Sequence, residues 1–293
     1  MRAGQLSAIT NDGQGIRVGP DDASGFAQRG FAFAKNGDFD KAITNLNEAI
    51  RLNPSDAVSY NNLGHAYLQK GDLDKAITNL NEAIRLDPKD VSAYDSRGIA
   101  YSKKGDFDRA ISNFSKTLEI APKNARLYNN RGIAYSEKGD FHKAISDFSE
   151  VLRMVPDNAK TLCNRGGVYI KAGEWEKALK DLNVAIRFDS KDADAYNSLA
   201  WLLATCPDIS IRKGKKGVFF ATRACELTRW HKWYCIGTLA AACAEVGDFG
   251  QAVKYQQQAM SLQGANDKER LDEQQRLLLY QEHKPYHEPT SAK

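Results

Sequence analysis

Hydrophobic and small residues recur along this chain with a helical spacing, and the whole pattern returns every 34 residues. Four near-identical segments show the interval: FDKAITNLNEAIRLNP, LDKAITNLNEAIRLDP, FDRAISNFSKTLEIAP and FHKAISDFSEVLRMVP. Each follows a second recurrent segment, such as YNNLGHAYLQKGD, and the two are joined at a Gly-Asp pair. The pattern predicts a helix-turn-helix unit repeated along the chain.

Residues 57–90 show the physical basis of one unit. In its first segment, apolar or small residues fall at i, i+3, i+4 and i+7, which is one stripe of a helix: Tyr60, Leu63, Gly64 and Tyr67. Its second segment carries another stripe: Ala76, Leu80 and Ala83. Between them, Gly71 suits a helix end in the left-handed conformation, and Asp72 suits the N-cap of the next helix. Neither helix buries its stripe alone, so we expect stability from stacking, with Gly64 and Ala76 allowing close backbone approach.

These residues and offsets resemble the tetratricopeptide repeat, which has a large aromatic, Leu-Gly, Tyr, a small Ala and Pro at fixed positions. The resemblance implies an all-α, right-handed superhelical solenoid of antiparallel helix pairs. We place the repeats at 23–56, 57–90, 91–124, 125–158, 159–192, 193–232 and 233–264. The sixth has a loop insertion near 208–217, and the seventh is divergent, with Cys243 in place of the tyrosine. Residues 1–22 are expected to be a flexible tail, and residues 265–293 a capping helix and tail.

The resemblance also implies that the first helix of each repeat lines a concave groove. Repeat positions 2, 5, 6 and 9 face away from the packing stripe and are mostly polar. They give the candidate partner-binding residues: Gln28, Asn61, Asn62, His65, Asp95, Ser96, Arg126, Asn129, Asn130, Lys160, Asn164, Asn197 and Ser198. An amide both donates and accepts, so such a row can bind the backbone of an extended peptide.

The amide row is similar to the asparagine ladder of O-linked N-acetylglucosamine transferase, whose catalytic domain has no counterpart here. The alternative is that asparagine is tolerated on an exposed helix face and recurs because the unit was duplicated. Tetratricopeptide co-chaperones instead clamp a carboxylate tail with Lys, Asn and Arg. The five positions of that clamp are occupied here by Asp95, Ile99, Asn130, Lys160 and Asn164, and only three of the five residues are compatible with it. The frame one repeat earlier is no better, although Arg126 and Lys160 could attract an acidic ligand.

Composition and motifs argue against several classes of function. The formal charge is only +4, which argues against nucleic-acid binding without a concentrated basic face. Five cysteines without a C-x-x-C pair argue against a disulfide framework and a zinc site and fit a reducing compartment. The N-terminus lacks the apolar run of a secretory signal and no segment is long enough to span a membrane, so the expected localisation is cytoplasmic. No phosphate loop, H-E-x-x-H pair or G-x-S-x-G elbow occurs, and we expect no catalysis, metal or cofactor.

The most basic stretch, IRKGKKG, is interleaved downstream with Phe219, Phe220, Trp230 and Trp233, a combination also seen in RNA or phosphate contacts. A solvated loop with aromatics packed against the last repeats is the favoured interpretation. Cys225 and Cys243 are expected to be small core residues.

The sequence therefore predicts a scaffold or adaptor that holds a protein or peptide, with no small-molecule substrate and no membrane association. One alternative is a structural assembly role for the divergent last repeats, which exposed apolar residues at that end would favour. An RNA-binding solenoid is the third hypothesis. The partner and the oligomeric state are left open.

Overall fold

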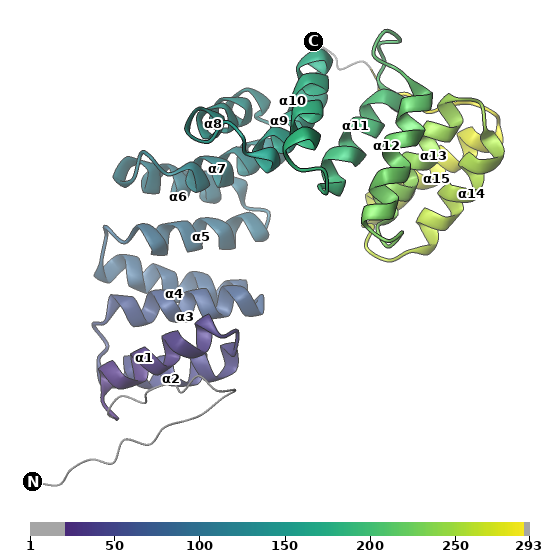
Figure 1. The fold of residues 1–293 in the computed structure, drawn as a ribbon. Coiled ribbons are helices and arrows are strands. Elements are labelled where there is room, and N and C mark those ends of the chain that lie inside the picture. Colours follow the sequence, from purple (N-terminus) through teal and green to yellow (C-terminus); the bar gives the residue numbers. More distant parts are fainter. Residues whose placement is uncertain (1–20, 290–293) are drawn as a thin grey trace, which may run out of the picture. The chain divides into compact units, whose positions relative to one another are not determined.

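A computed structural model describes residues 21–289, and these form 15 α-helices and no strand (Figure 1). The chain divides after Lys138 into two compact units, an N-terminal unit that ends with α7 and a C-terminal unit that begins with α8. The first helices of the pairs are α1 (Ala23–Lys35), α3 (Ala57–Lys70), α5 (Val91–Lys103), α7 (Ala125–Lys138), α9 (Ala159–Lys171), α11 (Ala193–Thr205) and α13 (Trp233–Glu245). The second helices are α2 (Phe39–Leu52), α4 (Leu73–Leu86), α6 (Phe107–Ile120), α8 (Phe141–Met154), α10 (Trp175–Phe188), α12 (Gly214–Leu227) and α14 (Phe249–Ser261), and α15 (Asp267–Gln281) follows them.

The turn between α3 and α4 forms as the Gly-Asp dipeptide predicts. Gly71 ends α3 in the left-handed conformation with φ of 82°, which a residue without Cβ adopts at little cost. The Asp72 carboxylate then accepts a hydrogen bond from the backbone N–H of Lys75 at 3.2 Å, and so caps α4. Such a cap contributes about 1 kcal/mol. Both expectations are confirmed. The predicted tail at 1–22 falls largely outside the described residues, and its Asp22 caps α1.

The two helices of a pair touch where the small residues were predicted. A Cβ added to Gly64 would lie 2.6 Å from Leu80 Cγ, closer than two carbons can approach, and 3.2 Å from the carbonyl oxygen of Ala76. Ala76, Leu80 and Ala83 are fully buried. The same contact recurs between Gly98 and Phe114. The small residues are therefore packing devices, as the stripe predicts.

An arginine directly before this glycine carries a contact that the sequence did not suggest. Arg97 donates from Nε to Asn113 Oδ1 at 2.8 Å and from Nη1 to Asn81 Oδ1 at 2.7 Å. Asn113 lies on the second helix of the same repeat and Asn81 on that of the preceding repeat, each 16 residues away. In the C-terminal unit, Arg165 binds Asp181 at 2.7 Å and Ser149 at 2.9 Å in the same way. These arginines tie consecutive second helices together.

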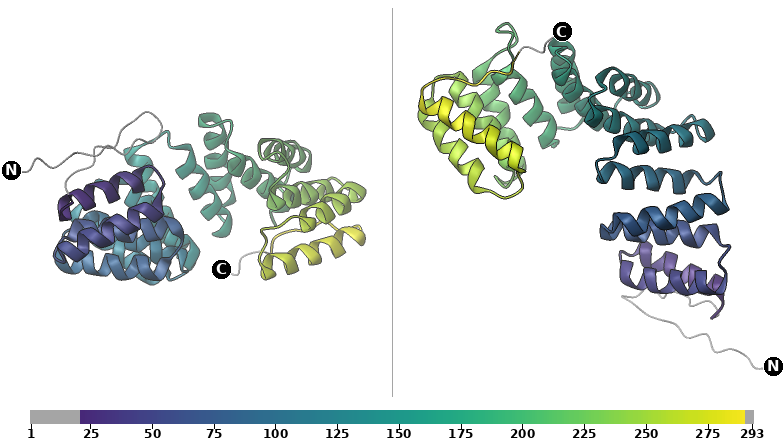
Figure 2. Two further views of the ribbon diagram at one scale, coloured as in Figure 1. Left: turned by 90° about the horizontal axis from the view of Figure 1, so that it is seen from below. Right: turned by 180° about the vertical axis from the view of Figure 1, so that it is seen from behind.

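The C-terminal unit has the most apolar interior. Every residue of α13 from Cys235 to Ala244 is buried, and it packs against α11, α12 and α14. Helix α15 lies along α14 and contacts α13, which the yellow helix in Figure 2 makes visible. Its buried Tyr280 joins this core. The helix thus covers an apolar surface that the last pair would otherwise expose.

Two adjacent glycines of α9 allow a direct test of the packing. A Cβ on Gly166 would lie 2.8 Å from Leu182 Cγ, whereas a Cβ on Gly167 would meet nothing within 4 Å. We expect Gly166→Ala to destabilise the protein by about 1–2 kcal/mol through overpacking. Gly167→Ala should stabilise it by about 0.5–1 kcal/mol, because alanine loses less backbone entropy in a helix. Urea denaturation followed by circular dichroism measures both, and equal effects would contradict the packing assignment.

Candidate functional site

The candidate residues lie on the face of the first helices opposite the packing glycines, which we call the A-face of each unit. Gln28, His65, Arg126 and Lys160 are exposed; Asn61, Asn62, Asn129, Asn130, Asn164, Asn197 and Ser198 are half-buried; Asp95 and Ser96 are buried. The row is therefore less uniform than its sequence suggests. Asp95 and Ser96 are too buried to offer a surface for direct contact.

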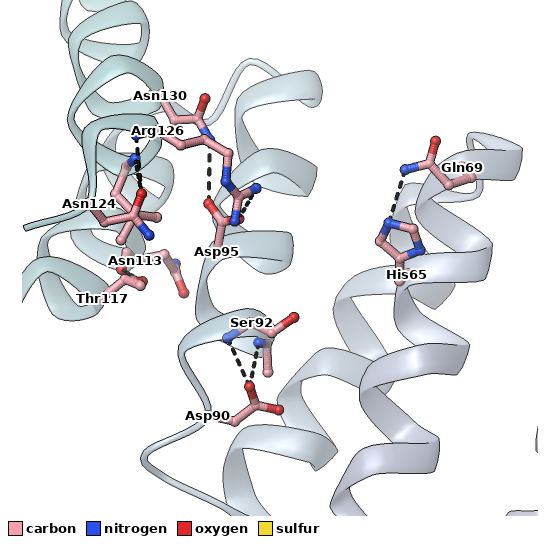
Figure 3. A network of polar contacts seen from close by, with 12 residues as sticks. His65, Gln69, Asp90, Ser92, Asp95, Asn113, Thr117, Asn124, Arg126 and Asn130 are labelled. Carbon is pink, nitrogen blue, oxygen red and sulfur yellow. Dashed lines mark hydrogen bonds and ion pairs between the residues drawn. The ribbon is translucent and has the colours of Figure 1, made fainter. Parts of the chain in front are cut away.

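A polar network centred on Asp95 connects α5 to α7 in the N-terminal unit (Figure 3). The Asp95 side chain is 4% exposed and pairs with Arg126 at 2.6 Å, while Asn130 Nδ2 donates to it at 3.3 Å. Burial raises the pKa of Asp95, and the charge of Arg126 and the Asn130 hydrogen bond oppose that rise only in part. The carboxylate holds the exposed guanidinium and one amide in place, which leaves the Asn130 carbonyl oxygen as an acceptor.

The other amides and the imidazole of this unit have local partners as well. Asn61 Nδ2 donates to Asp90 Oδ2, on the N-cap of α5, at 3.0 Å, so it couples neighbouring first helices. The His65 ring lies 3.3 Å from Gln69 Nε2, one turn along α3. Desolvation lowers the pKa of His65, which keeps the ring neutral at pH 7. The N-terminal A-face thus offers neutral hydrogen-bonding groups and one paired cation.

In the C-terminal unit, Lys160 is paired in a similar way. Its Nζ lies 2.8 Å from Asp194 Oδ2 on α11, and Tyr234 on α13 donates its hydroxyl to Asp194 Oδ1 at 3.1 Å. Although desolvation opposes it, these contacts hold the pKa of Asp194 below its ordinary value. The two cations proposed to attract an acidic ligand, Arg126 and Lys160, are therefore each balanced by a carboxylate of another repeat.

The cysteine side chains lie in the interior, and burial raises the pKa of each thiol. The five cysteines are all buried and free. Burial raises the pKa of Cys225 to about 12 and that of Cys243 to about 11, so neither thiol forms the reactive thiolate near neutral pH. Both are core residues, as predicted. Within residues 21–289, His, Cys, Asp and Glu form no group of three that could hold a metal ion. In the same part of the chain, no helix has the length and apolar character needed to cross a membrane.

Within the basic stretch IRKGKKG, the arginine has a structural role. Arg212 donates to Glu245 at 2.9 Å and to the carbonyl oxygen of Cys206 at 2.7 Å, which fastens the inserted loop to the end of α13. Phe220 and Trp230 pack against the core of the last repeats, as expected. Phe219 lies outside this core: it is 66% exposed, and its ring meets the Phe220 ring edge-on with 5.3 Å between the centroids. That part of the packing prediction is wrong.

The segment that follows α15, residues 284–289, is the feature that sequence periodicity missed. We call it the C-terminal strap. It forms no helix, and its backbone N–H at Glu288 donates to the carbonyl oxygen of Thr205 at 2.8 Å. Trp201 Nε1 donates to the Glu288 carboxylate at 3.1 Å, and His287 Nε2 lies 2.7 Å from Glu245 Oε2. The strap therefore binds to the ends of α11 and α13.

Comparison with known families agrees with this geometry. A sequence profile described as "TPR repeat" matches residues 30–71, 64–105 and 166–204, and one described as "Tetratricopeptide repeat" matches residues 89–157. Together they cover more than half of the chain, and the chain belongs to the tetratricopeptide repeat family. The family predicted from the repeated segments is confirmed. A comparison with curated proteins found no match.

Solved structures of other repeat proteins share the fold. A tetratricopeptide repeat protein from Parabacteroides merdae ATCC 43184 aligns with a TM-score of 0.66 and 17% identity over 88% of this chain and 98% of its own. YrrB, a TPR protein with an unusual peptide-binding site, aligns with a TM-score of 0.54 and 21% identity, over 60% of this chain and 90% of its own. MamA aligns with a TM-score of 0.54 and 23% identity, over 58% of this chain and 93% of its own. At these identities the likeness establishes an all-helical repeat fold and nothing finer.

The buried carboxyl of Asp95 makes a prediction about pH. Its folded-state pKa lies above the ordinary 3.8, so the folded protein keeps a proton that the unfolded chain has lost, and the stability contributed by this group falls as pH rises through that range. Asp95→Asn removes this loss, and the Asn130 amide can rotate to keep its hydrogen bond. We expect the thermal midpoint of the variant, relative to the native protein, to rise between pH 4 and pH 7.

The matched variant Arg126→Gln removes the cation that favours the ionised form. It should make the stability of the protein fall more steeply over the same pH range. A constant difference between Asp95→Asn and the native protein across that range would show that Asp95 has an ordinary pKa.

Proposed function

We propose that this protein is a non-catalytic interaction scaffold that binds an extended segment of a partner protein along the A-face of its repeats. The observation that carries the proposal is the set of half-buried amide and hydroxyl groups on the first helices of each unit. These are Asn61, Asn62, Asn129 and Asn130 in the N-terminal unit, and Asn164, Asn197 and Ser198 in the C-terminal unit. Such groups are held rigidly by the helices and can satisfy both the N–H and C=O groups of an extended backbone. Membership of a family of interaction modules and the peptide-binding site of YrrB support it.

The electrostatics of the A-face favour this function over nucleic-acid binding. Arg126 and Lys160 are paired with Asp95 and Asp194, so neither offers the uncompensated positive charge that a phosphate backbone requires. The ligand segment is instead recognised by hydrogen bonds spread over several repeats. Each bond contributes about 0.5–1.5 kcal/mol, so single substitutions should weaken binding only slightly.

The proposal predicts the result of affinity capture from the native lysate. The intact chain should retain a specific protein, and the variant with Asn62, Asn130 and Asn164 all changed to alanine should lose it. A matched control changes Asn47 and Asn183, which are exposed on the second helices α2 and α10, to alanine. Capture that survives the triple change but is lost after the control changes would place the binding surface on the second helices.

A second candidate function is a structural assembly role for the C-terminal unit, and one observation favours it. Leu271 and Leu278 lie seven residues apart on the same side of α15 and are 54% and 61% exposed. An exposed pair of leucines on the final helix offers a surface on which another helix could stack. In this function, α15 joins the protein to another copy or to a complex.

This candidate is tested by Leu271→Glu combined with Leu278→Glu. Light scattering after size exclusion should show that the native protein associates as its concentration rises and that the variant stays monomeric. Gln251→Glu with Gln257→Glu adds the same charge on exposed positions of α14 and should leave association unchanged. A native protein that is monomeric throughout would rule out self-assembly through α15.

A further inference from the structure

The C-terminal strap is held as a bound peptide would be held. Its Tyr286 ring lies 5.9 Å from the ring of Trp201, and the Arg276 guanidinium lies 5.8 Å from Tyr286 and 5.5 Å from Trp201. The Glu288 carboxylate accepts the Trp201 indole N–H. The Tyr286 ring and the Glu288 carboxylate, two residues apart, thus both contact Trp201. The backbone N–H of Glu288 donates to the carbonyl oxygen of Thr205.

The groups that hold the strap come from the first helices α11 and α13 and from the final helix α15. Trp201 and Thr205 lie on α11, Glu245 ends α13, and Arg276 lies on α15. Trp201 occupies repeat position 9, one of the positions predicted to contact a ligand. The strap therefore uses a side chain of the A-face, and the hydrogen bond between Trp201 and Glu288 joins residues 87 positions apart in the sequence.

A cavity of about 450 Å³ lies at the end of the strap, lined by Glu288 and Pro289 on one side and by α9, α10 and α11 on the other. Gly167 forms part of its wall, and a Cβ added there would meet nothing within 4 Å. The equivalent residues of the preceding repeats are large: Phe31, His65, Ile99 and Ile133. Trp175 and Leu202 supply apolar wall beside the polar Lys171 and Asn197, and the cavity is large enough to admit an apolar side chain.

A polar group in the wall of this cavity lacks a partner. Asn197 Oδ1 is buried and accepts no hydrogen bond. Leaving a buried acceptor unsatisfied costs free energy, and because this oxygen is itself shielded, a donor in the cavity would reach it only after the Asn197 side chain turns. The site thus has a tryptophan that binds an aromatic and a carboxylate, followed by a hollow with apolar walls.

We propose that the A-face of α9, α11 and α13 binds an extended partner segment in which an aromatic residue stands two positions before a carboxylate and an apolar residue follows. The strap occupies the first part of this site until such a segment displaces it. The proposal rests on the proposed peptide-binding function and assigns its ligand chemistry to these repeats. Because the strap is tethered, its effective concentration is high, and a partner gains its advantage from the apolar side chain that fills the hollow.

The experiment uses the full-length protein and a fluorescein-labelled peptide with the sequence of residues 281–293, QEHKPYHEPTSAK. In the variant Tyr286→Ala with Glu288→Ala the strap is released, and fluorescence anisotropy should show binding of the peptide. The native protein should bind it at least about tenfold more weakly, because its own strap competes. A peptide with both residues changed to alanine should not bind. Absence of binding to the released variant, with an unchanged circular dichroism spectrum, would overturn the proposal.

A second peptide tests the hollow. With leucine in place of Thr290, the peptide should bind the released variant more tightly. Gly167→Ile, which places the isoleucine of two earlier repeats in the wall of the hollow, should abolish the gain while retaining binding of the first peptide. An equal affinity for both peptides would show that the hollow does not bind an apolar side chain. A native dimer that the strap substitutions dissociate would assign the site to a second copy and overturn displacement by a partner.

The result also separates this inference from the general function. If neither peptide binds but capture from lysate still depends on Asn62, Asn130 and Asn164, the scaffold function stands and the assignment of an aromatic and acidic ligand to the last repeats fails.

Discussion

The close contact between the first and second helix of each pair is the constraint on which the rest of the structure depends. At Gly64 and Gly98 the two helices approach so closely that a single added carbon would overlap the opposing side chain. This fixes how each first helix is turned, and therefore which residues reach the opposite face. In the sixth repeat Ala200 replaces the glycine, and Gly217 on α12 lies against Ala200 and Ala204 instead. In this pair the glycine lies on the second helix, and the two helices still approach each other closely.

The arginine beside that glycine adds a preference for one stacking arrangement. A leucine at this position, as at Leu63, is satisfied by any apolar neighbour. Arg165 instead needs the Asp181 carboxylate on one second helix and the Ser149 hydroxyl on another, both at hydrogen-bonding distance. Its net contribution to stability is small because desolvation offsets the attraction, but a shifted stack would leave a buried charge unpaired. The ion pair therefore selects a register more than it adds stability.

The predictable part of the structure is the part that is local and repeated. Gly71 and Asp72 determine their turn through backbone conformation and one hydrogen bond, and both can be read from neighbouring residues. The burial of Asp95 could not be predicted in this way, since it depends on Arg126 in the next repeat. The strap was missed because it has no periodicity and depends on contacts with residues far away in the sequence. Phe219 was misplaced because aromatic character alone does not say which side of α12 it occupies: Ala221 and Ala224 face the core and Phe219 is exposed.

Because each repeat places the same positions on the A-face, selectivity for a ligand side chain is expected where the residues at those positions differ between repeats. Identical repeats present identical groups, and such a row can bind an extended backbone but cannot distinguish one side chain from another. Repeat position 9 is isoleucine at Ile99 and Ile133, but glycine at Gly167 and tryptophan at Trp201. The glycine creates a hollow and the tryptophan an aromatic surface on neighbouring helices of the C-terminal unit. Because the packing register places these two positions side by side, divergence of the last repeats creates a shaped site without changing the fold that supports it.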